Sequence, residues 1–300
     1  MDILNCKTKR LILGPKAGII NMTLNIKSNS KVKIYLTRIR SKLLYILKDI
    51  RHFIMKNFTN IKPYAIWVVG SGRSGTDILV HCLDRSIKVK TFNEDNSEAF
   101  DNWRLKSFDV IENVIKNSGA DLVLFKPIVE AMKSQELMER YPNSKTVFIT
   151  REYHDAIHSM IKFFGNEKIN AINSWIDTDF KNFPLVKNEL RELIRNIWKE
   201  APSIENASGI YWLVYNTSYL FMELYKDERV ILTDYDSLVL QPEKTLMRVC
   251  NFIGLDFSKT MIKNIYSSSV KHKAIPNLHP NLNESCDVAW EQLNQYLAIQ

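Results

Sequence analysis

Short apolar runs alternate with segments of helical periodicity from residue 63 to the carboxyl terminus. Apolar runs of this length are typical of buried strands, whereas apolar spacings of three and four residues are typical of helices. Strands that alternate with helices indicate a parallel sheet covered on both faces. The candidate strands are Ala65–Val69, Val89–Phe92, Leu122–Phe125, Thr146–Thr150 and Val230–Thr233. The pattern therefore predicts an α/β fold of three layers, α/β/α, around a central parallel sheet.

A long, mostly helical stretch, residues 166–226, separates the last two candidate strands. It is rich in aromatic residues: Trp175, Trp198, Tyr211, Trp212, Tyr215 and Tyr219. Such a set suits a substrate-binding subdomain and equally a plain helical core. We therefore expect a main domain over residues 63–300 that contains a helical insert at 166–226.

The amino-terminal region, residues 1–62, differs from the rest in charge. It holds fourteen lysines and arginines against two acids, a net charge of +12 in a chain of net charge +8. Residues 31–58 combine helical apolar spacing with basic residues. A basic, partly helical extension is therefore expected. One interpretation packs this helix on the main domain, and the other places it on an anionic membrane surface or a partner. Because the charge belongs to the extension, we expect no nucleic-acid partner.

The cysteine spacing and the lack of a targeting pattern exclude several classes of protein. The four cysteines form no C-x-x-C pair, so neither a disulfide framework nor a zinc site is expected. No apolar run approaches the roughly 18–20 residues needed to span a bilayer. Lysines and arginines interrupt the first residues, which argues against a secretory signal. We expect a cytoplasmic protein, with peripheral membrane attachment as the second interpretation; its oligomeric state is not readable from the sequence.

A glycine-rich loop follows the first candidate strand directly. It reads Gly-Ser-Gly-Arg-Ser-Gly-Thr, residues 70–76, and a helix-compatible run comes next. Glycines let the backbone approach an anion closely, and a helix amino terminus supplies free N–H groups and a positive dipole. Gly70 and Gly75 have the spacing of the nucleotide-triphosphate pattern G-x-x-x-x-G-K-[ST]. However, Thr76 stands in the place of the lysine, and the cation lies earlier, at Arg73.

A second candidate anion site follows the strand that ends at Thr150. Arg151 stands at the strand end and Ser159 lies eight residues later, on a helix that Asp155 could cap. A guanidinium fork and a hydroxyl can grip one phosphate. Since open α/β sheets bind ligands at the carboxyl ends of their strands, both sites should lie on the same rim.

Together these segments resemble the sulfotransferase superfamily, which uses 3′-phosphoadenosine-5′-phosphosulfate (PAPS). Residues 66–79 look like the family's 5′-phosphosulfate loop, and 147–159 look like its 3′-phosphate motif. A third match covers 230–246 and runs on to 252–255. The resemblance spans roughly residues 63–275 and implies a P-loop-like fold. It also implies sulfuryl transfer from PAPS to a hydroxyl or amine acceptor, with adenosine 3′,5′-bisphosphate (PAP) as product and no metal required.

The resemblance assigns the donor site. It implies that Arg73 contacts the 5′-phosphosulfate and that the rest of the cradle is Ser71, Gly72, Ser74, Gly75 and Thr76. Arg151 and Ser159 would hold the 3′-phosphate. Lys271 and Lys273 lie where relatives close a late loop over the nucleotide, although the family's glycine-rich version of that loop is absent.

The resemblance also suggests the catalytic residues. Glu94, just after the second strand, matches the base of carbohydrate- and protein-tyrosine-directed relatives, although Asp95 and Glu98 lie close by. Lys126, at the end of the third strand, resembles the family's lysine near the acceptor and the sulfonate. The cytosolic branch has a histidine after this strand and this chain has none there, so a carbohydrate acceptor bound by the helical insert is favoured.

Two other classes of function stay open at this point. A nucleotide kinase needs a loop lysine and a magnesium-binding carboxylate, and no hydrophobic strand ends in an evident aspartate of that kind. A catalytically degenerate, membrane-associated nucleotide-binding module is the third possibility. Dependence on Mg-ATP would favour a kinase, whereas stabilisation by PAP without magnesium would favour a sulfotransferase.

Overall fold

The computed structural model describes residues 30–263, 265 and 275–299. Contacts divide the chain into two units, Met1–Leu43 and Leu44–Gln300. The described part of the first unit is the beginning of helix α1 (Ser30–Phe58), which the sequence predicts over residues 31–58. All structure described below lies in the second unit.

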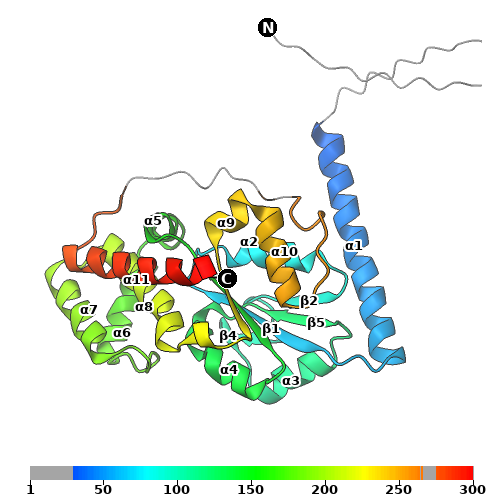
Figure 1. Ribbon diagram of the computed structural model, residues 1–300, viewed down its shortest axis with the longest axis horizontal. Coiled ribbons are helices and arrows are strands. Elements are labelled where there is room, and N and C mark those ends of the chain that lie inside the picture. Colours follow the sequence, from blue (N-terminus) through cyan, green and yellow to red (C-terminus); the bar gives the residue numbers. More distant parts are fainter. Residues whose placement is uncertain (1–29, 264, 266–274, 300) are drawn as a thin grey trace, which may run out of the picture. The chain divides into compact units, whose positions relative to one another are not determined.

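A parallel five-stranded sheet forms the centre of the second unit (Figure 1). The strand order is β2-β5-β1-β6-β7, which leaves β2 and β7 at the edges. All five strands predicted from the apolar runs are present, and each boundary agrees to within one residue. The strands are β1 (Tyr64–Gly70), β2 (Val89–Phe92), β5 (Leu122–Phe125), β6 (Lys145–Thr150) and β7 (Val230–Asp234).

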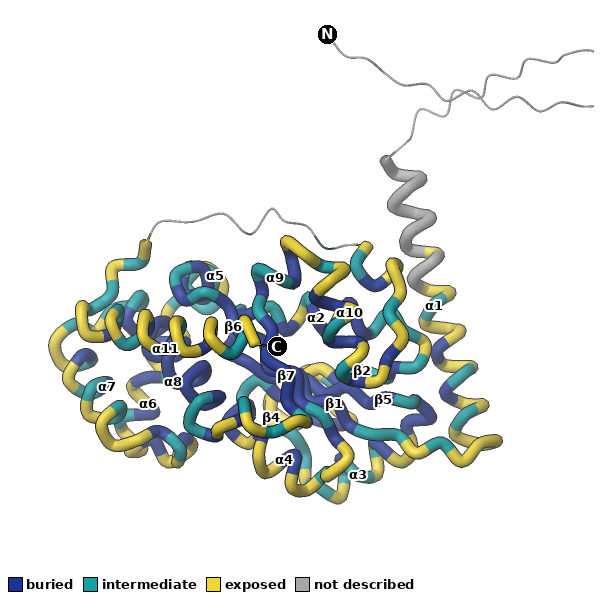
Figure 2. Tube along the Cα trace, in the orientation of Figure 1, coloured by how far each residue is buried: buried dark blue, intermediate teal, exposed yellow. Residues whose placement is uncertain are grey.

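Two hydrophobic cores lie on opposite faces of this sheet. Along β1, Trp67 and Val69 face one core, while Ile66 and Val68 face the other, because side chains alternate along a strand. Both sets are buried, so the strand is apolar throughout (Figure 2). The predicted three-layer α/β/α arrangement is confirmed.

The helices of the two outer layers are labelled in Figure 1. One face carries α2 (Thr76–Asp84), α9 (Tyr235–Leu240) and α10 (Pro242–Phe252). The other face carries α3 (Phe108–Lys116), η1 (Ile128–Lys133), α4 (Ser134–Arg140), α5 (Tyr153–Phe164), α8 (Ile204–Phe221) and α11 (Pro280–Ile299).

The segment 166–226 is helical, as the sequence predicts. It comprises α6 (Glu167–Asp177), α7 (Asn188–Glu200), α8 and η2 (Leu224–Lys226). Helix α8 is buried along most of its length, and its rings stack with one from α6: Trp175 of α6 lies 5.6 Å from Tyr211 of α8, which lies 4.4 Å from Tyr215. The aromatic residues of the insert therefore form a packed wall.

A small hairpin between β2 and α3 is absent from the predicted elements. Its strands, β3 (Phe100–Asp101) and β4 (Arg104–Leu105), are joined by Asn102 and Trp103. Both turn residues have positive φ, 47° and 67°, as a two-residue type I′ turn requires. Tryptophan is not a usual signal for that conformation, which explains why the sequence pattern does not predict the turn.

Helix α1 packs on the domain through its polar side. The ammonium of Lys48 is buried and contacts the carboxylate of Asp84 at 2.6 Å. The carbonyl of Ile87 lies 3.1 Å from a ring nitrogen of His52. A Cβ on Gly119 would lie 2.0 Å from the carbonyl oxygen of His52, so the helix backbone approaches the domain closely. Polar contacts thus hold the helix segment 44–58 in place.

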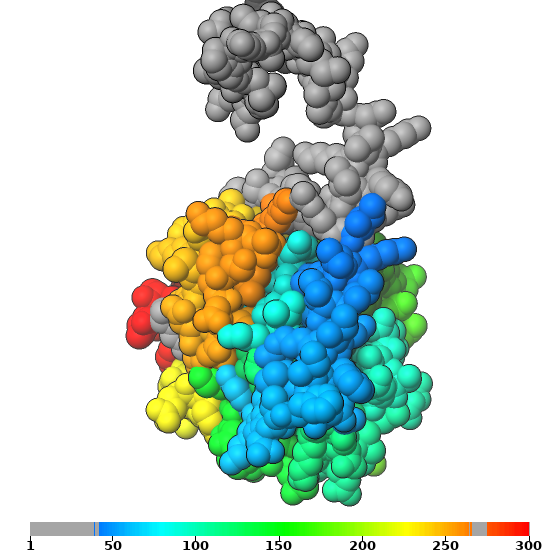
Figure 3. Space-filling model, turned by 90° about the vertical axis from the view of Figure 1, so that its right-hand side faces the viewer, coloured from blue at the N-terminus to red at the C-terminus, as the bar shows by residue number. Residues whose placement is uncertain are grey.

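The apolar side of the same helix faces outward. Ile46, Ile50 and Phe53 are 54%, 52% and 63% exposed, and Leu47, Ile54 and Phe58 are exposed as well. Figure 3 shows this outer surface of α1 at the front of the domain. A helix that buries its polar residues and exposes its apolar stripe reverses the usual arrangement. Among the described helices, none combines the length and apolar content needed to span a membrane.

Candidate active site

The glycine-rich loop connects β1 to α2 at the carboxyl edge of the sheet. A Cβ on Gly70 would lie 2.2 Å from the carbonyl oxygen of Ile149. Gly75 has φ of +102°, and a Cβ there would lie 2.5 Å from the ring of Tyr235. Both positions therefore require glycine, because a side chain would collide with neighbouring atoms and because the backbone has positive φ. The loop is a tight cradle that ends at the amino terminus of α2.

The serine and threonine side chains of the loop are buried. The hydroxyl of Ser74 donates to the carbonyl of Ser71 at 2.7 Å. The hydroxyl of Ser71 itself is buried and has no hydrogen-bond partner among the residues that the structure describes. Since a buried hydroxyl without a partner is costly, this atom suits an incoming anion. The cradle therefore fits a phosphate or sulfate group.

Arg73 joins the loop to the second predicted anion site. It adopts φ of +68°, which is uncommon for a residue with a Cβ. Its Nε donates to the hydroxyl of Ser159 at 3.2 Å, and its guanidinium lies 4.4 Å from the ring centre of Phe163. The two motifs, 86 residues apart, thus meet on one rim of the sheet.

The helix that carries Ser159 begins differently from the predicted start. The side chain of Glu152 caps α5 by accepting from the N–H of Asp155 at 3.0 Å. The expectation that Asp155 caps this helix is therefore wrong. Its carboxylate instead accepts from Arg151 at 3.4 Å, because one helical turn places the two side chains together.

Arg151 is held rigidly at the end of β6. It is only 5% exposed, and its guanidinium lies 4.1 Å from the ring centre of Tyr235. Its carbonyl accepts from the indole N–H of Trp212 at 2.9 Å, which ties the strand end to α8. Burial raises the pKa of nearby Asp236, and the charge of Arg151 opposes that rise. This guanidinium is a buried cation on the ring of Tyr235, the same ring that Gly75 of the loop approaches, and a buried cation of this kind suits an anion site.

Glu94 and Lys126 form a buried pair at the ends of β2 and β5. Glu94 Oε2 lies 3.7 Å from Lys126 Nζ, and the side chains are 7% and 11% exposed. Burial raises the pKa of Glu94 to about 7, while the charge of Lys126 and two backbone N–H groups of η1 oppose the rise. A carboxyl group with a pKa near neutral pH can accept a proton and release it again.

Asp77 is a member of this cluster that the sequence analysis does not single out. Its carboxylate contacts Lys126 Nζ at 2.6 Å, closer than that of Glu94, and is itself 67% exposed. The residue lies in the first turn of α2, directly after the glycine-rich loop, and this position is the signal that could have identified it. Lys126 therefore contacts both Asp77 of α2 and the buried Glu94.

Lys168 is a second residue that the sequence analysis misses. It lies in the first turn of α6 and is 8% exposed, and its ammonium is 3.4 Å from the ring centre of Tyr211. Tyr211 is close enough to Glu94 for the carboxylate to contribute to the raised pKa of its hydroxyl, after burial and Tyr215. The insert thus brings a buried cation and an aromatic wall close to Glu94.

Several predicted features lie elsewhere or differ. Lys271 and Lys273 fall outside the described residues. Strand β7 ends at Asp234, one residue beyond the predicted strand Val230–Thr233. That carboxylate accepts from the N–H of Ser237 at 2.8 Å and so serves as the cap of α9. Among the described residues, no cluster of three or more metal-ligating side chains occurs.

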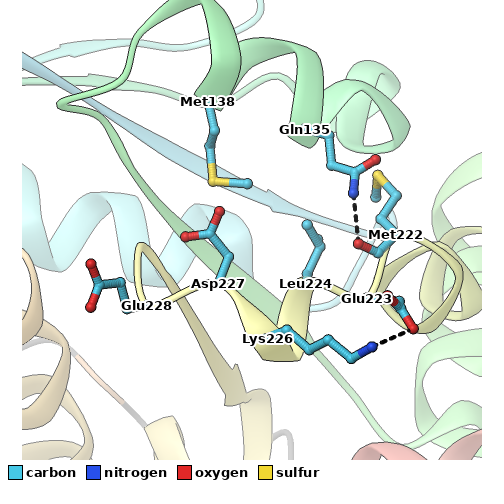
Figure 4. Close-up of a pocket in the computed structure, with 8 residues that line it drawn as sticks. All are labelled: Gln135, Met138, Met222, Glu223, Leu224, Lys226, Asp227 and Glu228. Atoms are coloured by element: carbon cyan, nitrogen blue, oxygen red, sulfur yellow. Dashed lines mark hydrogen bonds and ion pairs between the residues drawn. The ribbon is translucent and has the colours of Figure 1, made fainter.

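Among the described residues, one surface hollow adjoins the site and a larger one lies away from it. One of about 160 Å³ adjoins α2 and is lined by Asp77, Ile78, His81, Cys82, Met261 and Ile265. The larger, about 400 Å³, lies near the opposite ends of the strands, where Glu223, Asp227 and Glu228 line it (Figure 4). Lys226 in that hollow is paired with Glu223 at 2.7 Å. Its acidic lining does not suit a phosphate, so the larger hollow is separate from the anion sites.

Comparison with known proteins places these features in a family. The family model described as "Sulfotransferase domain" matches residues 63–285. No curated protein matches the chain. Three solved structures illustrate the similarity.

The sulfotransferase domain from the curacin biosynthetic pathway is 15% identical to this chain, with a TM-score of 0.43, and the match covers 78% of this chain and 92% of that one. A sulfotransferase from Alicyclobacillus acidocaldarius is 12% identical with a TM-score of 0.43, covering 77% and 93%. A mouse sulfotransferase complexed with PAP is 15% identical with a TM-score of 0.44, covering 82% and 89%.

Proposed function

We propose the following reaction for this chain, which belongs to the sulfotransferase family and is a sulfotransferase. It transfers the sulfuryl group of PAPS to a hydroxyl or amine acceptor. The observation that carries the proposal is the hydrogen bond between Arg73 and Ser159. It joins a glycine-rich anion cradle to a second anion motif on the rim where Glu94 and Lys126 are buried.

The residues of the two motifs suit the two ends of the donor. Backbone N–H groups of the loop and the hydroxyls of Ser71, Ser74 and Thr76 would hold the phosphosulfate, with Arg73 as its cation. Arg151 and Ser159 would hold the 3′-phosphate, and Lys271 and Lys273 are proposed to close over the nucleotide. The buried, unsatisfied hydroxyl of Ser71 supports this assignment.

Glu94 is proposed to act as the general base. It takes the proton of the acceptor hydroxyl while the acceptor oxygen forms a bond to sulfur. The bond between sulfur and the bridging oxygen breaks, and its electron pair stays on the phosphate of PAP. Lys126 and Arg73 stabilise the charge that develops on that oxygen. Because these fixed cations can offset the charge of a sulfuryl group, we propose transfer in line and without a metal ion.

A carbohydrate is the proposed acceptor class. This choice rests on the resemblance of Glu94 to the base of carbohydrate-directed relatives.

Donor binding and transfer can be tested separately. Wild-type protein should be stabilised by PAP in the presence of EDTA, by about 2.7 kcal/mol when PAP is at 100 times its Kd. Arg73→Ala should remove most of this stabilisation, whereas Lys162→Ala, a change at an exposed lysine of α5, should not. Transfer is then measured with radiolabelled PAPS against glycans, lipids, phenols and peptides. Stabilisation by Mg-ATP alone would overturn the proposal in favour of a kinase.

We also propose that α1 binds an anionic membrane surface. Its outward stripe includes Ile46, Ile50 and Phe53, and its polar side already packs on the domain. The region 1–62 carries a net charge of +12, which attracts anionic lipid and disfavours contact between two copies of the same surface. The cytoplasmic leaflet carries such lipids, and we place the enzyme there.

Vesicle sedimentation tests the membrane proposal. Vesicles with phosphatidylserine should bind the protein at least about tenfold more tightly than pure phosphatidylcholine vesicles. Ile46→Glu combined with Phe53→Glu should abolish binding, while Leu240→Glu combined with Val288→Glu adds equal charge elsewhere and should not. A dimer in solution that dissociates with the first pair of changes, without vesicle binding, would refute the proposal.

A further inference from the structure

A lysine buried against two aromatic rings lies at the wall of the active site. Lys168 is 8% exposed, and its ammonium is 3.4 Å from the ring centre of Tyr211 and 3.9 Å from that of Phe164. Burial lowers its pKa to about 8, and the neighbouring Glu167 opposes this. Within the part of the chain that the structure describes, no ion pair or hydrogen bond to this ammonium occurs. It remains mostly protonated at pH 7.

Such a side chain is costly for the fold. Removing an ammonium from water is strongly unfavourable, and contacts with ring faces offset only part of the loss. Buried lysines are usually paired. By contrast, Lys162 on neighbouring α5 is exposed to water. An anionic ligand beside this ammonium would therefore stabilise the buried charge.

The same two rings connect Lys168 to the glycine-rich loop. A Cβ on Gly72 would lie 3.4 Å from the ring of Phe164 and 3.7 Å from that of Tyr211. Gly72 of the cradle thus packs on the same two rings that contact Lys168. Phe163 precedes Phe164, and the centres of the two rings are 4.9 Å apart. The guanidinium of Arg73 lies over the ring of Phe163. Arg73 and Lys168 therefore flank one pair of phenylalanines.

The tyrosine wall connects Lys168 to the catalytic carboxylate. Tyr211 stacks on Tyr215 at 4.4 Å. Burial raises the pKa of both hydroxyls; their mutual contact raises the pKa of Tyr211 and lowers that of Tyr215, and the charge of Glu94 makes a smaller contribution that raises both. Lys168 comes from α6, in the insert, whereas Arg73 and Lys126 come from the loop and the sheet. It is thus a cation on the insert side of the site.

We propose that Lys168 binds an anionic group of the acceptor, so that the enzyme selects acceptors bearing a carboxylate or sulfate near the reacting hydroxyl. This inference rests on the proposed sulfuryl transfer and specifies its substrate class. The transferred group already has Arg73, Lys126 and the loop N–H groups beside it. A separate cation on the insert is therefore assigned to the other substrate.

The test compares two sugars that differ in one group. Methyl β-D-glucuronide has a carboxylate where methyl β-D-glucoside has a hydroxymethyl group. Each is titrated calorimetrically into the protein saturated with PAP, so that the donor site is filled. The glucuronide should bind at least about tenfold more tightly, as expected for a charge-assisted hydrogen bond.

Three variants decide whether Lys168 causes the preference. Lys168→Met should erase it and leave the affinity for PAP unchanged, whereas Lys168→Arg should keep it. Lys162→Met removes the same charge from the neighbouring surface and should keep it too. Equal binding of the two sugars to wild type, or a preference that survives in Lys168→Met, overturns the inference. Loss of PAP binding in Lys168→Met would instead assign the lysine to the donor, and failure of wild type to bind PAP would refute the proposed function itself.

Discussion

Replacing Glu94 by glutamine should abolish transfer and at the same time stabilise the protein at alkaline pH. The carboxyl is buried, and its pKa is about 7 in the folded protein against an ordinary value of 4.5. A difference of this size corresponds to about 3 kcal/mol between the protonated and ionised forms. Glutamine has the shape of the protonated acid and does not ionise.

The sign of the stability effect follows from the direction of the shift. Because folding raises the pKa of Glu94, the neutral acid stabilises the fold fully below pH 4.5, and this contribution is lost as pH rises through about 7. At pH 8 the wild type carries the ionised, buried carboxylate, so Glu94→Gln should be more stable by up to about 3 kcal/mol. At pH 4.5 the two proteins should be equally stable.

Activity should change in the opposite direction. A base must be ionised to accept a proton, so the wild-type rate should rise with pH and reach half its maximum near pH 7. Loss of the base should lower kcat by about 10²- to 10⁴-fold. Urea unfolding at pH 4.5 and 8, and initial rates between pH 5 and 9, provide both measurements.

A neighbouring acid supplies the matched control. Asp95 is exposed in the same loop, and Asp95→Asn should change neither the rate nor the stability. Glu94→Gln with a rate within threefold of wild type, or a wild-type midpoint near pH 4.5, would refute the assignment. Loss of activity in Asp95→Asn alone would move the role of base to that residue.

Three further changes test other parts of the site and its support. Gly75→Val should destabilise the fold and abolish PAP binding in calorimetry, because its φ of +102° and a tyrosine ring 2.5 Å away exclude a Cβ; unchanged affinity would contradict the cradle. Asp77→Asn should lower the pH midpoint of the rate, since the charge of Asp77 helps to raise the pKa of Glu94; a higher midpoint would contradict the cluster. Lys48→Met should cost about 3–5 kcal/mol in urea unfolding, because it leaves the carboxylate of Asp84 without its buried partner; a loss below about 1 kcal/mol would show that α1 is held by other contacts.

The sheet and the glycine-rich loop could be predicted from the sequence for local reasons. A strand buried on both faces needs a short apolar run, so Ile66–Val69 and Val147–Ile149 are recognisable without their neighbours. A tight turn before a helix needs glycine at fixed positions, as Gly70 and Gly75 show. The placement of Glu94 and Lys126 at strand ends follows from the same pattern together with the family resemblance.

The pKa values, ion pairs and burial of the site residues depend on contacts between distant segments. The pKa of Glu94 reflects what covers it, and its cover comes from η1, α2 and the insert rather than from its own loop. Asp77 meets Lys126 across 49 residues, and Lys168 is buried only because Phe164 and Tyr211 converge on it. The direction that α1 faces is likewise decided by Asp84 and Asp121, which bind its polar side. Periodicity defines the two sides of a helix, but desolvation and ion pairing, which are not local, decide which side is buried.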